Sequence, residues 1–507
     1  MKINSTFSLV VAICLLSTCL YSCKGSQGNK KVSSSTGWHF NDPNYGGFER
    51  VNFNPGAMFA PNLVLITGGT FVMGSTQDQV MTEWDNIPRR VTVNSFYMDQ
   101  TEVSNHNYCE YLFWLNRVFG SSENSEQRAV YTRSLPDTMV WREPLGYNEP
   151  LITIYLRHPA YQDYPVVGVS WRQASDFCVW RSDRVNEKRL LDKGYIAALD
   201  LEPSPDNYFS TETYSVGLYE VNAPGKKMEG KQASYTTGDL LPNYRLPTEC
   251  EWEYAALGLI GNTYAGNIES RRVYPWNGNY VRESNPKSRH YGQFTDNFKR
   301  GRGDYMGVAG HPNDGYAIPA PTGSFAPNDF GLYNMAGNVA EWVQDVYRPL
   351  SFEDVADYSP FRGNLFQVNV MDPATGLPVK DPITGRIQKR NIEDTDYEDL
   401  TSLNFRKSDY INYKDGDWES LLVDYKDVNK KWSDNDEFYG TVDMYTAWDE
   451  GEPANIRSLI SDKSRVVKGG SWRDPAYYLS PSVRRYLDED MAANYIGFRC
   501  AMNYMGN

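Results

Sequence analysis

Apolar and polar residues alternate in several distinct patterns along the chain. Residues 9–16 form an apolar run that is shorter than the roughly 20 residues a membrane-spanning helix needs. Residues 63–66 and 70–75 are β-forming runs on either side of a Gly-Gly turn, and this arrangement predicts a hairpin. Residues 91–98 alternate between apolar and polar side chains, which predicts a single further strand.

Two stretches carry helix signals. Ser104 is a predicted N-cap, and apolar side chains follow it at helical spacing at Tyr108, Tyr111, Leu112 and Leu115. Thr248 and Glu251 form a predicted capping box, in which the hydroxyl accepts the amide of Glu251 and the carboxylate reaches back. Gly258 is the predicted end of that helix, because glycine readily adopts the left-handed conformation.

Segments of low apolar content separate these patterns. Residues 24–37 have the composition of a flexible tether, and residues 38–48 form an aromatic, turn-rich lead. Residues 372–376 and 381–385 both read Asp-Pro-x-Thr-Gly, a tight-turn signature flanked by apolar residues that predict short β-ribbons. We interpret the acidic run 393–399 as a solvated loop.

Composition narrows the range of functions. A net charge of −14 disfavours a nucleic-acid partner, because phosphate binding needs a basic surface. The 37 tyrosines, 13 tryptophans and 40 glycines indicate a loop-rich fold in which aromatic side chains cover long loops. The 5 histidines are widely separated and form no His-x-x-x-His pair, so the sequence supports neither a zinc nor an iron centre.

The N-terminus predicts a lipoprotein. Lys2, the apolar run and the sequence Leu20-Tyr21-Ser22-Cys23 are typical of a bacterial lipoprotein signal peptide over residues 1–22. Cys23 would then carry the lipid, and residues 23–61 would be the lipidated tether and lead. Acyl chains such as palmitate stabilise membrane binding by about 0.8 kcal/mol per buried CH₂. No aspartate follows Cys23, which by resemblance to bacterial sorting rules predicts the outer membrane and its periplasmic face.

Cysteine usage leaves several pairings open. The chain holds 7 cysteines, and the predicted mature body keeps Cys109, Cys178, Cys250 and Cys500 beside the lipidated one. An oxidising compartment favours disulfides, although the sequence alone allows any pairing among them. For Cys109 and Cys250 the alternative is two buried free thiols.

Five sequence blocks, in this order, resemble the formylglycine-generating enzyme or sulfatase-modifying factor family. They are residues 245–256, 274–276, 328–343, 467–472 and 497–501. The resemblance implies an α+β fold, with short helices around small, irregular sheets, that is related to C-type lectins. It places the domain at residues 62–505, interrupted by two large insertions at 182–243 and 350–463. It also implies a disulfide between Cys178 and Cys500.

The resemblance implies that the catalytic metal is lost. In the resembling enzymes two cysteines after a Gly-Gly-Ser turn hold copper, and the matching positions here are Asp474 and Leu479. A carboxylate and an isobutyl group cannot supply the soft thiolate pair that selects Cu(I), nor a thiolate redox centre. The sequence therefore predicts a retained fold without copper and without enzymatic activity.

The resemblance also implies calcium as a cofactor. One calcium of the family would be held here by Asn334, Gly337, Val339 and Glu341. A second would be held by Asn297, Phe298, Asp314 and Tyr316. Calcium demands hard oxygen ligands of the kind that these side chains and their carbonyls provide. The alternative is that Asn334 and Glu341 only cap a turn and a helix.

The lead points to one branch of the family. Residues 35–49 resemble the GldJ type within the GldJ/GldK-type gliding-motility lipoproteins, which belong to the type IX secretion machinery. That resemblance implies a structural component of protein export whose partners are other secretion and gliding proteins. Two alternatives remain at this point. One is a lectin-like module that binds glycan or peptidoglycan, and the other is a thiol oxidase with relocated cysteines.

Overall fold

The structure, a computed structural model, divides into two compact units, Met1–Pro55 with Asn507 and Gly56–Gly506. It describes residues 32–33, 35–36, 38–45, 60–75, 86–144, 146–196, 199–200, 202–219, 233–263, 272–276, 278–301, 314–348, 361–363, 367–391, 446–449, 452–456 and 463–505. The predicted signal peptide, the lipidation site Cys23 and the acidic run 393–399 lie outside these residues. Among the described helices, none has the length and apolar character needed to cross a bilayer.

The described part of the first unit consists of turns. Val32 and His39 form an isolated antiparallel bridge. A short 3₁₀ helix, η1 (Pro43–Tyr45), follows. Asp42 starts it, because the Asp42 carboxylate accepts the amide of Asn44 at 2.9 Å.

The first four strands of the second unit belong to two different sheets. β1 (Leu63–Ile66) pairs antiparallel with β4 (Phe96–Asp99), whereas β2 (Gly69–Met73) pairs antiparallel with β3 (Arg89–Val93). The predicted hairpin at the Gly-Gly turn is therefore wrong, because its two strands belong to different sheets. The predicted single strand 91–98 is wrong for the same reason, since it divides into β3 and β4.

A close approach of two backbones sets the point at which the strands change sheet. The amide of Gly68 donates to the Ser95 hydroxyl at 3.0 Å. A Cβ on Gly68 would lie 2.4 Å from the carbonyl oxygen of Val93, so only glycine lets the two segments come this close. Both segments bend here, and each leaves one sheet for the other.

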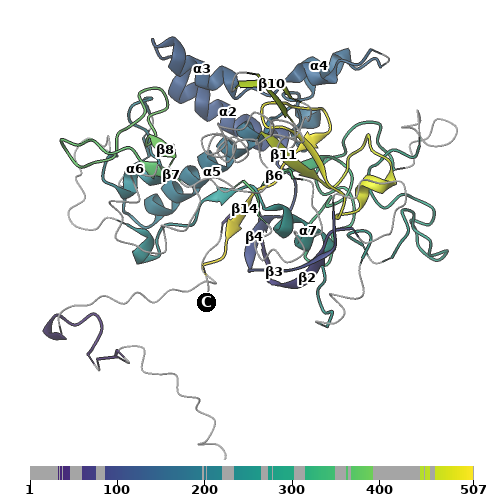
Figure 1. Cartoon of the computed structure of the whole chain (residues 1–507), viewed down its shortest axis with the longest axis horizontal. Helices are drawn as coiled ribbons and strands as arrows, with labels where there is room; N and C mark the ends of the chain where they lie inside the picture. Colours follow the sequence, from purple (N-terminus) through teal and green to yellow (C-terminus); the bar gives the residue numbers. More distant parts are fainter. Residues whose placement is uncertain are drawn as a thin grey trace, which may run out of the picture. The chain divides into compact units, whose positions relative to one another are not determined.

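Two four-stranded sheets organise the second unit (Figure 1). The first has the order β1-β4-β14-β5, where β5 is Tyr244–Arg245 and β14 is Ala501–Asn503. The second has the order β12-β11-β6-β13, with β13 parallel to β6. Its strands are β6 (Ala340–Val346), β11 (Ser464–Lys468), β12 (Arg485–Asp488) and β13 (Ile496–Gly497). Another pair, β9 (Thr446–Asp449) and β10 (Glu452–Ile456), forms a separate two-stranded ribbon.

Two long helices pack together beside the first sheet. α2 (Asn105–Phe119) begins after Ser104, whose hydroxyl accepts the third helical amide at 3.3 Å, as predicted. The predicted apolar positions of α2 are all buried. α5 (Trp171–Asp192) contributes Phe177, which stacks on Tyr108 of α2 with ring centroids 5.8 Å apart. This aromatic contact is part of the largest apolar cluster of the described chain.

A third helix, α7 (Glu249–Leu257), confirms its predicted ends. Thr248 and Glu251 form the capping box, and Gly258 ends the helix with φ = 56°. The shorter described helices are α3 (Ser125–Arg133), α4 (Glu149–Ile154), α6 (Thr211–Ser215), η3 (Thr138–Trp141), η4 (Pro159–Tyr161), η5 (Tyr235–Thr237) and η9 (Ala476–Leu479). Short helices around small sheets make this an α+β fold, which confirms the predicted class.

The predicted insertion 182–243 packs onto α5. It begins inside that helix, which continues without a break to Asp192. Its apolar side chains form a separate cluster that includes Leu190, Phe209 and Leu240. These residues therefore have a small core of their own on the side of the domain formed by α5.

A ribbon of residues 367–391 lies within the predicted insertion 350–463. β7 (Gln367–Asn369) pairs with β8 (Lys389–Asn391) at its base. Both Asp-Pro-x-Thr-Gly signatures form the predicted turns. In the first the Thr375 hydroxyl donates to Asp372 at 2.8 Å, and in the second the Thr384 hydroxyl donates to Asp381 at 2.6 Å.

The second of these turns docks onto the first insertion. The Tyr208 hydroxyl donates to the carbonyl oxygen of Thr384 at 2.7 Å. Arg386 pairs with Asp183 of α5 at 3.0 Å. The first turn makes no such contact with the described residues, and Met371 and Leu377 beside it are 52% and 44% exposed. One turn thus fastens the ribbon, while its twin faces solvent.

The two turns offer a matched pair of substitutions. Gly376 and Gly385 have φ of 66° and 68°, so alanine costs roughly 1–2 kcal/mol at either position. At Gly385 the new methyl would also meet the Pro205 carbonyl oxygen at 2.1 Å, whereas nothing lies within 4 Å at Gly376. We therefore expect Gly385→Ala, but not Gly376→Ala, to detach the ribbon. Hydrogen exchange of residues 367–391 measures this, and equal protection in both variants would contradict the docking.

Candidate functional site

Asp474 lies at the first position that the resemblance assigns to a copper-binding cysteine. Nη1 of Arg485 donates to Asp474 Oδ1 at 2.8 Å, and Nη2 lies 2.8 Å from Oδ2. The Ser471 hydroxyl also donates to this carboxylate. A charge-assisted pair of this kind is directional and strong. Asp474 therefore fixes the turn after the Gly-Gly-Ser segment and presents no soft ligand.

Leu479 lies at the second of these positions and ends the 3₁₀ helix η9. Its side chain is fully buried. It belongs to an apolar cluster with Phe294, Phe298 and Ala336. No group that could bind a metal ion or carry a thiol is present at this position, and the position is closed to solvent.

The loop before β6 brings the two predicted calcium sets together. Asn334, Gly337 and Asn338 have positive φ of 53°, 76° and 56°, so the chain turns sharply here. The amide of Asn338 donates to the carbonyl oxygen of Asn297 at 2.9 Å. A Cβ on Gly337 would lie 2.5 Å from that same oxygen, which explains why glycine occupies the position.

Glu341 does not fit the role of calcium ligand that the resemblance gives it. Its carboxylate accepts two hydrogen bonds from the buried guanidinium of Arg499, at 2.7 and 2.6 Å. Nε1 of Trp252 donates to it at 2.8 Å. A second cation beside Glu341 would be repelled by Arg499 at short range in a poorly screened interior. Val339 of the same set has a buried side chain, so only its carbonyl could serve.

Glu102 is the carboxylate that sequence reasoning missed. It accepts the side-chain amides of Asn334 and Asn338 at 2.8 and 2.9 Å. Burial raises the pKa of Glu102 to about 8. The Oδ1 atom of Asn334 is buried and has no hydrogen-bond partner. Glu102 and Asn334 therefore offer the hard oxygen atoms that Glu341 cannot.

The second predicted calcium set is brought together as a unit. The Asp314 carboxylate accepts the amides of Phe298 and Tyr316 at 3.3 and 2.9 Å. Burial raises the pKa of Asp314 to about 6. The side-chain amide of Asn297 donates to Ile318 at 3.0 Å. The oxygen atoms of Asp314 and Asn297 fit the requirements of calcium.

A metal held only by ionisable side chains is not supported in the described residues. No group of three or more His, Cys, Asp or Glu side chains there could hold a metal ion. Any calcium at the two sets would therefore depend on amide and carbonyl oxygens as well as on Glu102 or Asp314.

The predicted cysteine pair lies together in the core. The sulfur atoms of Cys178 and Cys500 are 3.4 Å apart and buried. This distance exceeds the roughly 2.05 Å of a disulfide, so the two are thiols here and the bond remains a prediction. Cys109 is half-buried and donates to the carbonyl oxygen of Leu156 at 3.5 Å, while Cys250 is buried elsewhere. Burial raises the pKa of Cys109 and Cys250, which makes both poor nucleophiles.

A buried ion network joins α7 to the second sheet. Nζ of Lys468 lies 3.0 Å from Glu253 and 3.4 Å from Glu249. Arg484 donates to Glu249 at 2.7 and 3.0 Å. Opposite charges that are buried together compensate one another electrostatically. Removing one of them would leave its partners as unpaired buried charges. No local sequence pattern reveals this network, because its members are brought together only by the fold.

Comparisons with known proteins agree with this architecture. Residues 50–504 match the family described as "Sulfatase-modifying factor enzyme 1-like domain". The chain is 26% identical over 310 residues to the formylglycine-generating enzyme of Mus musculus, covering 57% of this chain and 60% of that protein. It is 25% identical over 307 residues to the inactive C-alpha-formylglycine-generating enzyme 2 of Bos taurus, covering 57% and 71%.

Two further matches extend the range of organisms and structures. The chain is 26% identical over 336 residues to the formylglycine-generating enzyme of Thermomonospora curvata, covering 62% of this chain and 80% of that protein. The solved structure of PvdO from Pseudomonas aeruginosa aligns over 89% of this chain and 100% of its own, with 16% identity and a TM-score of 0.37.

We predict that Cys178 and Cys500 form a disulfide in an oxidising compartment. They are 322 positions apart, and the chain-entropy model gives roughly 6 kcal/mol for closing a loop of that size. Alkylation of the unfolded, unreduced protein followed by mass analysis should leave both residues unlabelled. Cys109 should be labelled and serves as the internal control. Labelling of Cys178 or Cys500 would show that the pairing is wrong.

Proposed function

The chain belongs to the sulfatase-modifying factor enzyme 1-like family, and we propose that it is a catalytically inactive member with a structural role in an outer-membrane secretion machinery. The observation that carries the inactivity is the chemistry at Asp474 and Leu479. One is held in an ion pair with Arg485, and the other is buried among apolar side chains. The similarity to a relative named as inactive supports the same conclusion.

The N-terminal residues support the proposed location at the outer membrane. Residues 35–49 resemble the GldJ type of gliding-motility lipoprotein, which favours a role in type IX secretion and gliding. The signal sequence ending at Cys23 favours a lipid anchor in the outer membrane, with the domain on the periplasmic side. A lipid-anchored domain can stay at the membrane without a spanning helix.

The ribbon of residues 367–391 supports a role in assembly. Its second turn is recognised within the chain by Tyr208 and Asp183 through the contacts described above. The first turn has the same Asp-Pro-x-Thr-Gly sequence and presents Met371 and Leu377 to solvent. Loops held on a rigid scaffold are common places for binding, so we place the partner contacts in the insertion 350–463 and secondarily in 182–243.

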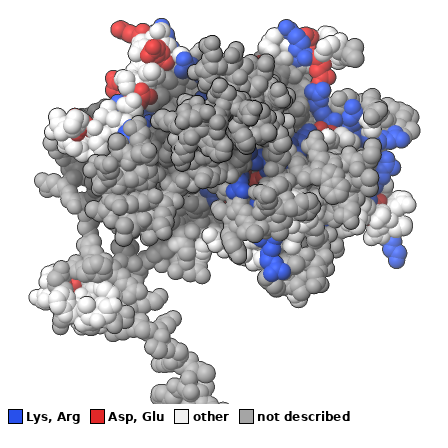
Figure 2. Space-filling model, in the orientation of Figure 1, with Lys and Arg blue, Asp and Glu red and all other residues white. Residues whose placement is uncertain are grey.

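The distribution of charge supports a protein partner. In Figure 2, acidic and basic side chains lie together over α3, and they are also mixed on the other side of the described part of that face. The net charge of −14 also favours a protein partner over a nucleic acid. A nucleic-acid partner would require a concentrated basic surface, which this arrangement does not favour.

Calcium is proposed as a structural ion. Asn334 with Glu102, and Asp314 with Asn297, would provide the oxygen ligands. The ion would supply positive charge between buried carboxyl groups and so fix these loops. The chain's own part is to orient the oxygens, which it does through the positive-φ turns at Asn334 and Gly337.

The thiol-oxidase alternative lacks support from the cysteine geometry. The only two described thiols that meet, Cys178 and Cys500, are 1% and 0% exposed. A substrate therefore cannot reach them without opening of the core. For a lectin-like function, none of the contacts described above favours glycan binding.

We predict no formylglycine-generating activity. The protein should not convert a cysteine-containing sulfatase peptide in the presence of added copper, because Asp474 and Leu479 cannot bind it. Mass analysis of the peptide measures turnover, and an active formylglycine-generating enzyme is the positive control. Turnover that disappears when any one of the mature cysteines is replaced would overturn the proposed inactivity.

We predict that calcium acts through Glu102 and not through Glu341. Glu102→Gln should abolish the rise in melting temperature caused by calcium, because the carboxylate ligand is lost. Glu341→Gln should lower the melting temperature with or without calcium, because Arg499 loses its buried charged partner. Thermal unfolding in calcium and in a chelator separates these results. A calcium effect lost only in Glu341→Gln would restore the role implied by the resemblance.

We predict that the insertion 350–463 carries the partner contacts. Its deletion would leave Asp183 without Arg386, so the deletion is combined with Asp183→Asn to avoid an unpaired buried charge. This form should be folded and membrane-anchored, yet no longer cross-link to other secretion proteins in the outer membrane. Asp183→Asn alone is the matched control. If the deleted form still assembles and supports secretion, the interface lies elsewhere, and the lead 38–59 is the next candidate.

A further inference from the structure

One loop of the domain is basic although the chain as a whole is acidic. Residues 281–292 hold Arg282, Lys287 and Arg289 and a single carboxylate, Glu283. Three positive charges and one negative charge give the loop a formal charge of +2 with histidine neutral, whereas the chain carries −14. Local charge decides what this surface binds, because the Debye length is only about 8 Å at physiological salt.

Hydrogen bonds within the loop hold it in a defined shape. The amide of Glu283 donates to the carbonyl oxygen of Gln293 at 2.9 Å, and the amide of Gly292 donates to that of Glu283 at 2.8 Å. The Glu283 carboxylate accepts the amide of Asn285 at 2.8 Å, so the one acidic group of the loop is used within it. The Asn285 side chain in turn accepts the amide of Lys287 at 3.0 Å. The tip is therefore ordered before any partner binds.

The cations of the loop face solvent and have no acidic partner. Arg282, Lys287 and Arg289 are all exposed. Exposed cations elsewhere in the domain are often paired, as Arg142 is with Glu149 at 3.0 Å. In the described part of the chain no carboxylate forms such a pair with any of the three loop cations. Their charges are therefore available to an anionic partner.

An exposed aromatic ring follows these cations in the loop. Tyr291 is 59% exposed. Its amide donates to the carbonyl oxygen of Ser288 at 3.2 Å, which fixes the backbone at this position. Tyrosine favours the boundary between water and lipid, because its ring is apolar and its hydroxyl is polar. Cations beside an exposed aromatic ring are typical of surfaces that lie on a membrane.

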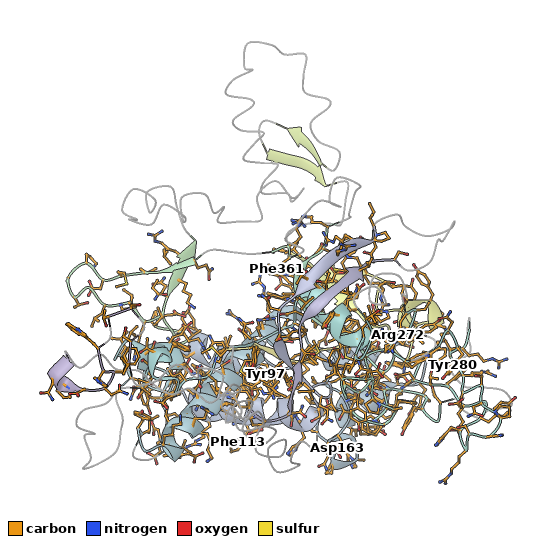
Figure 3. All side chains as sticks on the ribbon, turned by 90° about the horizontal axis from the view of Figure 1, so that it is seen from below. Tyr97, Phe113, Asp163, Arg272, Tyr280 and Phe361 are labelled. Carbon is orange, nitrogen blue, oxygen red and sulfur yellow. The ribbon has the colours of Figure 1, made fainter. Side chains whose placement is uncertain are left out.

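The loop lies at one edge of the domain. Figure 3 shows Tyr280, which directly precedes it, toward that edge and well apart from Phe113 and Asp163. Figure 1 labels β7 and β8 of the ribbon toward the other edge, along the horizontal axis that the two views share. A surface that binds the loop therefore leaves the exposed turn of the ribbon free for a protein partner.

We propose that the loop 281–292 docks on the anionic headgroups of a lipid bilayer. Lys287 and Arg289 pair with headgroup phosphates, and the Tyr291 ring lies at the boundary between the headgroups and the acyl chains. This inference rests on the proposed lipid anchor at Cys23, which keeps the domain near the membrane and raises the effective concentration of the lipid surface. The loop then orients the domain, and the anchor supplies most of the attachment.

A membrane fits these features better than other anionic partners do. Proteins that bind duplex DNA neutralise many phosphates along an extended basic surface, and the loop offers only three cations. An acidic protein surface would pair with the same cations, but the proposed anchor already holds the loop close to lipid. A soluble acidic polymer is therefore the competing ligand in the test.

The test is co-sedimentation of the full chain with lipid vesicles in a chelator, so that calcium cannot bridge carboxylates to phosphates. The chain carries Cys23→Ser, which prevents lipidation. Vesicles of equal parts phosphatidylglycerol and phosphatidylcholine should bind it more tightly than vesicles of phosphatidylcholine alone. Lys287→Gln combined with Arg289→Gln should weaken binding to the anionic vesicles at least about tenfold, because each cation near such a surface contributes roughly fivefold.

Two further variants make the result specific. Arg133→Gln combined with Arg157→Gln is the matched control, because it removes the same charge at exposed positions outside the loop, and it should bind like the unsubstituted chain. Tyr291→Ala should weaken binding to the vesicles and leave binding to soluble polyglutamate unchanged. All of these side chains are exposed, so circular dichroism and the melting temperature should not change.

Two outcomes would overturn the proposal. One is equal vesicle binding by the loop variant and the matched control. The other is binding of polyglutamate that is as tight as binding of the anionic vesicles and independent of Tyr291, which would identify an acidic protein as the partner. Failure of the anchor is a separate result, because it is measured by the absence of labelled palmitate at Cys23 in cells and does not affect vesicle binding by the unlipidated chain.

Discussion

The burial of Arg499 is the constraint on which the rest of the domain depends. Its guanidinium holds Glu341 through bonds of 2.7 and 2.6 Å and donates to the carbonyl oxygens of Asp99 and Tyr333 at 3.2 and 2.9 Å. One side chain from the C-terminal block thus joins β4, β6 and the loop before β6. A buried charge that loses its partner costs roughly 3–5 kcal/mol, so these segments are expected to fold as one unit. The same contact occupies both carboxylate oxygens of Glu341.

The parts of the fold that follow from the sequence are those decided by near neighbours. Ser104, Thr248 and Gly258 act on amides within one helical turn, and the helices begin and end where these residues predict. The Asp-Pro-x-Thr-Gly turns are equally local. The strand pairing is not, because Gly68 meets Val93 from a distant part of the chain. Two β-forming runs around a Gly-Gly pair are compatible with a hairpin as well as with two separate strands. Only the contact of Gly68 with Val93 places the two runs in different sheets.

At the candidate site, too, some contacts can be expected from the sequence, whereas others arise only from tertiary packing. The residues that the resemblance assigns to a second calcium lie together in the fold, because the Asp314 carboxylate accepts the amides of Phe298 and Tyr316. No sequence pattern points to Glu102, because its significance arises from burial beside Asn334 and Asn338, which are far away in sequence. A carboxyl group in an ordinary sequence context becomes unusual only once it is withdrawn from water without a cation. Tertiary packing, and not a local pattern, therefore decides which carboxyl groups become unusual.

The side chains of Asp474 and Leu479 are both part of the packed structure. Each replacement forms contacts of its own, an ion pair with Arg485 in one case and apolar packing in the other. Both side chains therefore contribute to stability. The two turns of the ribbon differ in this respect: a Cβ on Gly385 would lie 2.1 Å from the carbonyl oxygen of Pro205, whereas a Cβ on Gly376 would meet no atom within 4 Å. One copy of the repeated turn, 381–385, is docked, and the other, 372–376, is exposed. The docked copy anchors the ribbon well enough to present the exposed copy in a defined position. A scaffold requires this of a binding loop.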